Sequence, residues 1–238
     1  MQISTLLYTA LNLLVPGLCP TCNTATINSI YPICSQCMDA LSYRKYFSMK
    51  YSEYIPEIYS CFIYADIVKK CIKTMKYGRK KNMVLVFNKT IEEMFTSLSA
   101  KKSIQVPNKL HMSHKTCHMK LYDLIVPVPI HPERKRVRGF NQSEIITDHI
   151  SKIIKIPASS SVLLKTKNTA PQTHQTLTTR IDNLTGAFAA IPGTSIFKKN
   201  ILLVDDVVTT GTTLETCAKE LLKSGAKSVT GFTLARTL

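Results

Sequence analysis

The chain has 238 residues, 45% of them apolar, and its 31 lysine and arginine residues against 15 acidic ones give a formal net charge of +16. These values describe a soluble globular protein with one core domain and a small appendage. No apolar run approaches the ~20 residues of a membrane span, so membrane insertion is excluded. The basic excess favours polyanions or phosphorylated small molecules as partners, although solubility alone explains such a charge equally well.

The run from Ile3 to Val15 is largely apolar but is interrupted by Thr5, Thr9 and Asn12, and the first basic residue of the chain is Arg44. A secretory signal begins with basic residues, so this segment does not fit one. We predict a short amphipathic helix here and a cytoplasmic location for the protein.

Two Cys-x2-Cys pairs follow, separated by eleven residues, and they consist of Cys19, Cys22, Cys34 and Cys37. This spacing suits four thiolates around one zinc ion, which would supply the folding energy that such a short, weakly apolar segment lacks. Two disulfides or unpaired thiols are the alternative, and a cytoplasmic location disfavours disulfides. We predict a structural zinc ribbon, and a boundary between a domain of residues 1–45 and one of residues 46–238.

An apolar stretch at 58–64 predicts a strand, and the residues after it predict a helix whose apolar face includes Val68, Ile72 and Met75. Lysines recur along this helix at spacings of four, three and four: Lys69, Lys73, Lys76 and Lys80. Such a ridge could follow a nucleic-acid phosphate backbone, although a solvated helix face is the more frequent explanation. Gly78 is expected to end the helix, and a second helix is predicted over 82–98.

The apolar run from Leu124 to Val128 predicts a second buried strand. The prolines there are expected to end it, because proline cannot continue the hydrogen-bond ladder. The run directly after it, at 132–138, contains four cations in five positions. At the C-terminal end of a strand these side chains could receive a pyrophosphate, for which the forked donors of arginine are well suited. A helix is predicted over 141–154.

Residues 165–182 are rich in threonine and glutamine, have no glycine and offer little to bury. They predict a mobile loop that closes over a bound ligand, and a plain long connector is the alternative. Another strand is predicted over 187–191, and a last strand over 228–234 is expected to end the sheet.

The most informative stretch is 201–213, with the sequence ILLVDDVVTTGTT. Its four apolar residues predict a buried parallel strand, and Asp205 and Asp206 come where that strand is expected to end, the usual place for a ligand in an open α/β sheet. A loop then leads into a helix, whose free N–H groups and dipole favour an anion. The loop residues are Thr209, Thr210, Gly211, Thr212 and Thr213.

A phosphate on this loop, with two carboxylates nearby to bind sugar hydroxyls, would make a ribose-5-phosphate cradle. The alternative is an ordinary turn in which an aspartate caps the helix, which explains one acid but not the whole motif. Thr212 and Glu215 also fit a capping box at the start of the helix.

The stretch at 201–213 resembles the phosphoribosyl pyrophosphate (PRPP) motif of type I phosphoribosyltransferases. The sequence VPVP at 126–129 with RGFNQ at 138–142 narrows the resemblance to the ComF/GntX-like branch, which also has an N-terminal four-cysteine zinc ribbon. A loop of that branch is matched here by Gln172, Arg180, Asn183, Gly186, Ala187 and Phe188. The resemblance implies an α/β fold, with a type I phosphoribosyltransferase-like parallel sheet flanked by helices and a small four-cysteine ribbon before it.

The resemblance also implies roles for the candidate residues. Asp205 and Asp206 would hold the ribose hydroxyls and stabilise a cationic sugar, and Thr209 to Thr213 would hold the 5-phosphate. Mg²⁺ would bridge the ribose hydroxyls and the pyrophosphate, and Arg180 would join the catalytic site when its loop closes. The residues facing the pyrophosphate would be Val128, Pro129, Arg134 and Arg138.

Two functions fit these residues. ComF relatives are associated with natural competence, so one function is the uptake or cytoplasmic handling of transforming single-stranded DNA by a PRPP-binding protein with a helicase-like partner. The other is an active, Mg-dependent phosphoribosyltransferase of metabolism, acting on a nucleobase-like acceptor. No stretch of the sequence identifies that acceptor.

Overall fold

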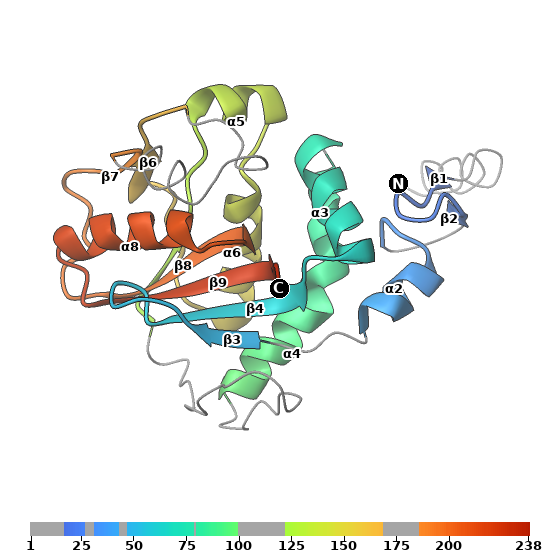
Figure 1. Ribbon diagram of the computed structural model, residues 1–238, viewed down its shortest axis with the longest axis horizontal. Coiled ribbons are helices and arrows are strands. Elements are labelled where there is room, and N and C mark those ends of the chain that lie inside the picture. Colours follow the sequence, from blue (N-terminus) through green and yellow to red (C-terminus); the bar gives the residue numbers. More distant parts are fainter. Residues whose placement is uncertain (1–16, 27–30, 43–46, 79, 100–121, 169–185) are drawn as a thin grey trace, which may run out of the picture.

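A five-stranded sheet in the order β3-β4-β9-β8-β5 forms the centre of the computed structural model, which describes residues 17–26, 31–42, 47–78, 80–99, 122–168 and 186–238 (Figure 1). Strand β3 pairs antiparallel with β4, and the remaining neighbours pair parallel. The predicted α/β class with a parallel sheet is confirmed. The strands are β3 Phe47–Lys50, β4 Glu57–Ile63, β5 Leu124–Pro127, β8 Asn200–Val208 and β9 Ser228–Arg236.

Strand β9 lies at the middle of the sheet, between β4 and β8, and does not end it as the sequence predicted. Val229 is buried on one face of the sheet, and Phe232 and Leu234 are buried on the other. The edge strand β5 is buried on both faces as well, so burial of both faces does not distinguish a central strand from an edge strand. The central position of β9 follows from its parallel pairing with β4 on one side and with β8 on the other, which chain order alone does not specify.

Helices and a small antiparallel sheet of two strands, β6 and β7, cover the two faces of the central sheet. Helices α3, α4 and α6 share one buried cluster with Leu202 and Val204 of β8, whereas α8 shares a second cluster with Ile201 and Leu203 of the same strand. The alternation along β8 is the two-residue period of a strand with both faces buried. The covering elements are α3 Asp66–Tyr77, α4 Asn88–Ser99, α6 Gln142–Ile154, α8 Thr212–Lys223, β6 Leu163–Lys165 and β7 Phe188–Ala190.

One segment differs from its predicted element, and a second, for which no element was predicted, is helical. The helix predicted over 82–98 is a 3₁₀ segment, η1 Lys81–Phe87, followed by α4, and the apolar run in η1 is buried at Met83, Val84, Val86 and Phe87. The cationic run after β5 is a short helix, α5 Pro132–Arg138. Proline suits the first position of a helix, and Gly139 ends it with a positive φ of 84°.

The N-terminal segment consists of a small hairpin, β1 Gly17–Leu18 with β2 Ala25–Thr26, and helix α2 Ser35–Ser42. Its buried residues Cys19, Ile33 and Leu41 share a cluster with α3. The amphipathic helix predicted before residue 16 and the domain boundary at 45–46 lie outside the described residues. Within the described ranges, no helix is both long and apolar enough to cross a bilayer.

Candidate functional site

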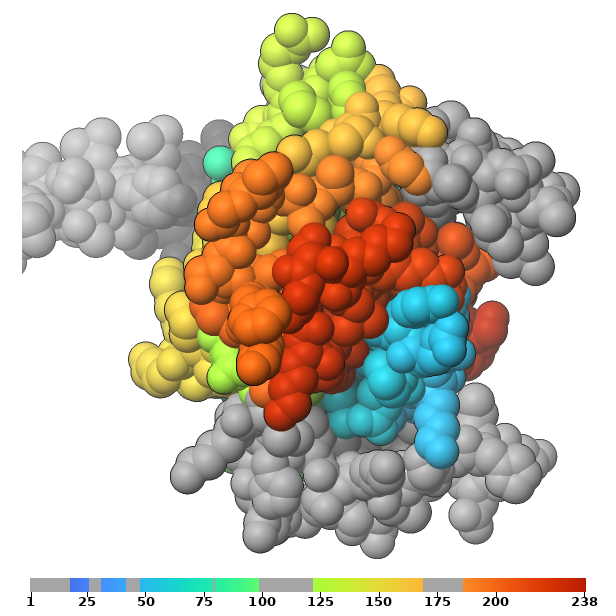
Figure 2. Space-filling view, turned by 90° about the vertical axis from the view of Figure 1, so that its left-hand side faces the viewer, coloured from blue at the N-terminus to red at the C-terminus, as the bar shows by residue number. Residues whose placement is uncertain are grey.

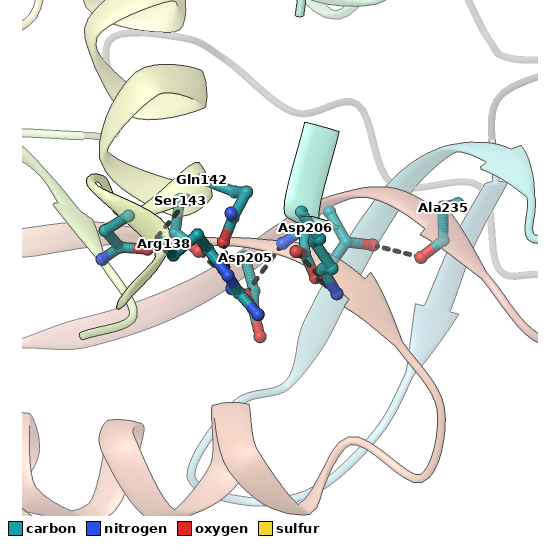
Figure 3. A network of polar contacts seen from close by, with 9 residues as sticks. Arg138, Gln142, Ser143, Asp205, Asp206 and Ala235 are labelled. Carbon is teal, nitrogen blue, oxygen red and sulfur yellow. Dashed lines mark hydrogen bonds and ion pairs between the residues drawn. The ribbon is translucent and has the colours of Figure 1, made fainter. Parts of the chain in front are cut away.

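The two adjacent aspartates lie within the last half of β8, which continues to Val208 rather than ending before them. Consecutive side chains of a strand point to opposite faces of a sheet. Asp205 lines a pocket together with the loop that precedes α8, whereas Asp206 meets Lys76 of α3. The two carboxylates therefore have different surroundings, which the sequence motif alone does not distinguish (Figure 3).

Asp205 accepts two hydrogen bonds, and its pKa lies well above the ordinary value of an aspartate. Its Oδ1 accepts from the Ser143 hydroxyl at 2.9 Å and from the backbone N–H of Asp206 at 2.8 Å. Burial and the neighbouring charge of Asp206 raise the pKa of Asp205 to about 7, although Lys76 and the two hydrogen bonds oppose the shift. A carboxyl with such a pKa exchanges a proton near neutral pH.

Asp206 is ion-paired with Lys76, whose Nζ lies 2.8 Å from each of the two carboxylate oxygens. The side chains are only 22% and 9% exposed, so the pair is shielded from water. Burial alone would lower the pKa of Lys76, but the carboxylates of Asp206 and Asp205 outweigh it and raise that pKa. The attraction within a shielded pair of this kind is screened less by water and salt than the attraction within a surface ion pair.

This ion pair corrects the predicted lysine ridge. Lys69 and Lys73 are exposed on α3, but Lys76 turns inward to Asp206, and Lys80 lies beyond the end of the helix. The regular spacing suggested one continuous surface. The tertiary structure separates it, because the third lysine lies on the side of α3 that meets β8.

The loop between β8 and α8 forms the wall of the pocket with Asp205. All five predicted loop residues, Thr209 to Thr213, line it, and the hydroxyls of Thr210 and Thr212 lie 2.9 Å apart. The predicted capping box is wrong: Gly211 is the N-cap, no side chain caps α8 in the described structure, and Thr212 is already helical. The start of α8 therefore faces the pocket with its backbone rather than with a capping side chain, which is the usual arrangement of an anion site.

Tyr51 braces this loop from the hairpin that joins β3 and β4. Its hydroxyl donates to the carbonyl oxygen of Thr210, and a Cβ added to Gly211 would lie 2.3 Å from the Tyr51 ring. Gly211 also has a positive φ of 78°, so glycine is required here for both conformation and space. Figure 2 shows the cyan hairpin against the red C-terminal elements, and the Lys219 ammonium lies 4.4 Å from the ring centroid of Tyr54.

The residues predicted to face a pyrophosphate follow β5, which pairs in parallel with β8 and ends on the same side of the sheet. Val128 donates its N–H to Val204 and accepts from the Asn141 side chain, so its backbone braces β5 against β8 and α6. Arg138 of α5 donates to Gln142 at 2.5 Å, and its guanidinium lies 5.6 Å from the ring centroid of Tyr77. Because Gln142 precedes Ser143, α6 links this arginine to Asp205 (Figure 3).

Arg134 and Lys165 add further positive charge near the acids. Burial and the charge of Arg138 lower the pKa of Arg134, and burial and the charge of Arg134 lower the pKa of Lys165. Cations that lower the pKa values of one another in this way favour a bound anion. Pro129 is half-buried after β5. Lys165, the first residue of the predicted mobile loop at 165–182, is the last residue of strand β6, and Arg180 lies outside the described residues.

Four residues of this site were not predicted from sequence patterns: Lys76, Ser143, Lys165 and Tyr51. Lys76 was assigned to the wrong surface, and Lys165 was assigned to the mobile loop. Ser143 lies two residues after the helix cap Asn141, a position that marked it only as part of a helix start. No local pattern marks Tyr51, because its contact with Thr210 spans 159 residues.

The four cysteines of the N-terminal segment come together as predicted. Their sulfur atoms all lie within 4.8 Å of one another, they are unbridged, and Cys22 and Cys34 are 3.5 Å apart. Four thiolates around zinc at Zn–S distances of about 2.3 Å stand about 3.8 Å apart, so the arrangement fits a structural zinc site. Thr21 bonds the sulfurs of Cys19 and Cys37, each at 2.9 Å.

Residues 142–237, which include α6, β8, the loop after it, α8 and β9, match the phosphoribosyl transferase domain family. The chain is 33% identical to competence protein F of Haemophilus influenzae over 51% of this chain and 54% of that protein, so it spans about half of that relative. It is 29% identical to DNA utilization protein YhgH of Escherichia coli K12 over 95% of this chain and all of that protein. It is also 28% identical to competence protein ComFC of Bacillus subtilis over 67% and 65% of the two chains. These relatives confirm the predicted resemblance to the ComF-like family.

Proposed function

We propose that this protein binds PRPP, or a ligand with a 5-phosphoribosyl group, at the edge formed by β8 and α8, and that it supports the cytoplasmic handling of transforming single-stranded DNA. The observation that carries the first part is the pocket that Asp205 shares with the Thr209–Thr213 loop. A sugar phosphate has an anion at one end and hydroxyls at the other, and this pocket offers a helix N-terminus beside a carboxylate. The relatives with competence and DNA utilization names support the second part.

In this proposal the loop binds the 5-phosphate and Asp205 accepts hydrogen bonds from the ribose hydroxyls. The pyrophosphate then lies toward α5 and β6, where Arg134, Arg138 and Lys165 supply positive charge. In this proposal the backbone of Val128 and Pro129 lies on the pyrophosphate side, and Arg180 joins the site from the predicted loop at 165–182. Mg²⁺ arrives with the ligand and neutralises charge on the pyrophosphate.

The PRPP proposal predicts a strong effect of Gly211→Ala. Calorimetric titration of the full chain with PRPP and Mg²⁺ should show binding, and the alanine should weaken it about tenfold or more, because its Cβ displaces Tyr51 and the loop. Gly193→Ala is the matched control, since Gly193 has a φ of 79° and a Cβ added there meets nothing within 4 Å. Equal losses in the two variants, or no binding by the wild type, would contradict the proposed cradle.

A metabolic phosphoribosyltransferase is the second candidate function. The observation in its favour is Asp205, whose pKa of about 7 allows a proton to be held or released beside the proposed sugar. Incubation with PRPP, Mg²⁺ and a panel of nucleobase-like acceptors tests it. Acceptor-dependent release of pyrophosphate would establish turnover, and PRPP binding without release would favour a binding role.

The proposed DNA surface uses the exposed part of the lysine ridge. Lys69, Lys73 and Lys80 are exposed on or next to α3, and the Tyr77 ring is 70% exposed between them and α5. Cations beside an exposed aromatic ring suit single-stranded DNA, whose phosphates pair with lysine and whose bases stack on the ring. A helicase-like partner belongs to the same proposal.

The DNA proposal predicts a salt-dependent loss for Lys69→Ala/Lys73→Ala. Lys76 stays unchanged in this variant because it belongs to the acid pair. Fluorescence anisotropy with a labelled oligothymidine should give weaker binding and a log–log salt slope that is smaller by about 1.4, since each lost phosphate contact removes about 0.7. The control is Lys198→Ala/Lys227→Ala, which removes two exposed lysines at the opposite end of β8 and β9. Wild-type binding that does not respond to salt would rule the surface out.

A further inference from the structure

Lys76 connects two elements that the chain keeps far apart. It lies on α3, and Asp206 lies 130 residues later on β8, yet its ammonium is 2.8 Å from both carboxylate oxygens. The helix carries three other exposed lysines, Lys69, Lys70 and Lys73, so a surplus of positive charge does not explain why this one is directed inward. Taking a lysine out of water is unfavourable unless its partner is well placed.

The acid pair needs a cation for an electrostatic reason. Asp205 is half-buried and the adjacent Asp206 is buried, so the charge of each disfavours the charge of the other. One lysine supplies one positive charge for two carboxyl groups. It contacts Asp206 directly and acts on Asp205 only through space, where it favours the ionised form.

We propose that Lys76 is a positioning residue of the PRPP site, which fixes Asp206 as an anchored anion on the α3 face and thereby leaves Asp205 as the single acid that responds to the sugar. This inference rests on the proposed function and divides the labour of the aspartates, which the sequence motif presents as equivalent. Asp205 is the acid that lines the loop pocket. Ser143 and the Asp206 backbone fix the position of Asp205, and Lys76 opposes the effects of burial and of Asp206 by favouring its ionised form.

The charged and titratable groups around the pair come from each element packed against it. Lys76 belongs to α3, Lys165 to β6 and Cys217 to α8, and each interacts electrostatically with Asp205. Tyr64, just before α3, interacts with both Lys76 and Asp206. Of these, Lys76 is the one whose positive charge directly contacts the acid pair.

Lys76→Met should therefore change how PRPP binding depends on pH. Without the ammonium, Asp205 stays protonated to higher pH, so the midpoint at which affinity rises should move up by about one unit or more. At pH 7 the affinity should fall about fivefold or more, because the ionised fraction of Asp205 falls from about one half to about one tenth or less. Lys76→Arg should behave like the wild type, because a guanidinium can also pair with both oxygens. Calorimetry with PRPP and Mg²⁺ between about pH 6 and pH 9 measures these changes.

The control is Lys223→Met, which removes an equally short ion pair at 2.8 Å from the exposed end of α8. Comparison with this variant also accounts for the titration of PRPP itself, which affects both variants equally. The double variant Lys76→Met/Asp206→Asn should reverse the upward shift, because it removes the carboxylate together with its cation. If Lys76→Met and Lys223→Met give the same profile, or if the double variant keeps the shift, Lys76 does not act through Asp206.

Ligand-free protein separates this inference from the proposed function. Carbon-13 NMR of the aspartate carboxyl groups measures the titration midpoint of Asp205 without any PRPP. A higher midpoint in Lys76→Met, with no PRPP binding by the wild type, would overturn the proposed function and leave the electrostatic role of Lys76 intact. An unchanged midpoint alongside normal PRPP binding would overturn the role of Lys76 alone.

Discussion

Replacing Asp205 with asparagine is expected to weaken PRPP binding by about a hundredfold and to stabilise the ligand-free protein above pH 7. The loss of affinity follows because a neutral amide is a weaker acceptor for ribose hydroxyls than a carboxylate, and because hydrogen bonds to a charged group contribute about 1.5–3 kcal/mol each. The gain in stability follows from the electrostatics of the pair. The substitution would remove the charge that burial and Asp206 disfavour.

The direction of the pH effect comes from the raised pKa of Asp205. Its folded-state pKa of about 7 lies above the ordinary value of 3.8, so folding favours the protonated carboxyl. That contribution is fully present below about pH 4 and is lost as the pH rises to about 7. Asparagine does not titrate, and the variant therefore keeps its stability where the wild type loses it.

Thermal melting of both proteins at pH 5 and pH 8 measures this effect. The melting temperature of Asp205→Asn minus that of the wild type should be larger at pH 8 by roughly 5 °C or more. Asp148→Asn is the control, because Asp148 is exposed on α6 and away from the acid pair. A difference that does not change with pH, or one that Asp148→Asn shares, would show that Asp205 carries no raised pKa.

Replacing Cys34 with serine is expected to abolish zinc binding and to lower the melting temperature by at least about 5 °C. Serine cannot supply a thiolate, and three remaining sulfurs hold zinc far more weakly than four. The effect should extend beyond the ribbon, because Lys70 of α3 donates to the Thr21 carbonyl at 2.7 Å and the cysteine segment shares a buried cluster with α3. The helix that carries Lys76 therefore loses part of its support.

Metal analysis and melting curves measure both parts of this prediction. The wild type should contain one zinc ion per chain and Cys34→Ser none, and chelation of the wild type should reproduce the lower melting temperature. Cys61→Ala is the control, since Cys61 is buried against Met94 outside the cluster and its variant should keep the metal. Full zinc content in Cys34→Ser, or a wild type without zinc, would rule out the four-cysteine site.

The elements with strong local patterns were predicted well. Strand β8 and helix α8 are marked by a four-residue apolar run and by helical spacing at Leu214, Cys217 and Leu221, and the structure has both elements. The cysteine pairs predicted a four-sulfur cluster because two short spacings constrain the ligands locally. The predicted capping box failed because a glycine with positive φ starts α8 one residue earlier than the pattern implied.

By itself, the sequence determined the α/β class, the four-cysteine cluster and the loop that meets Asp205, because each depends on residues that are close together in the chain. Only the tertiary structure decided the central position of β9, the contact of Tyr51 with the loop and the inward turn of Lys76. Those features depend on pairings across more than a hundred residues, and helical spacing says which side chains share a face but not what that face meets. The different surroundings of Asp205 and Asp206 arise in the same way, from the elements packed on the two faces of one strand.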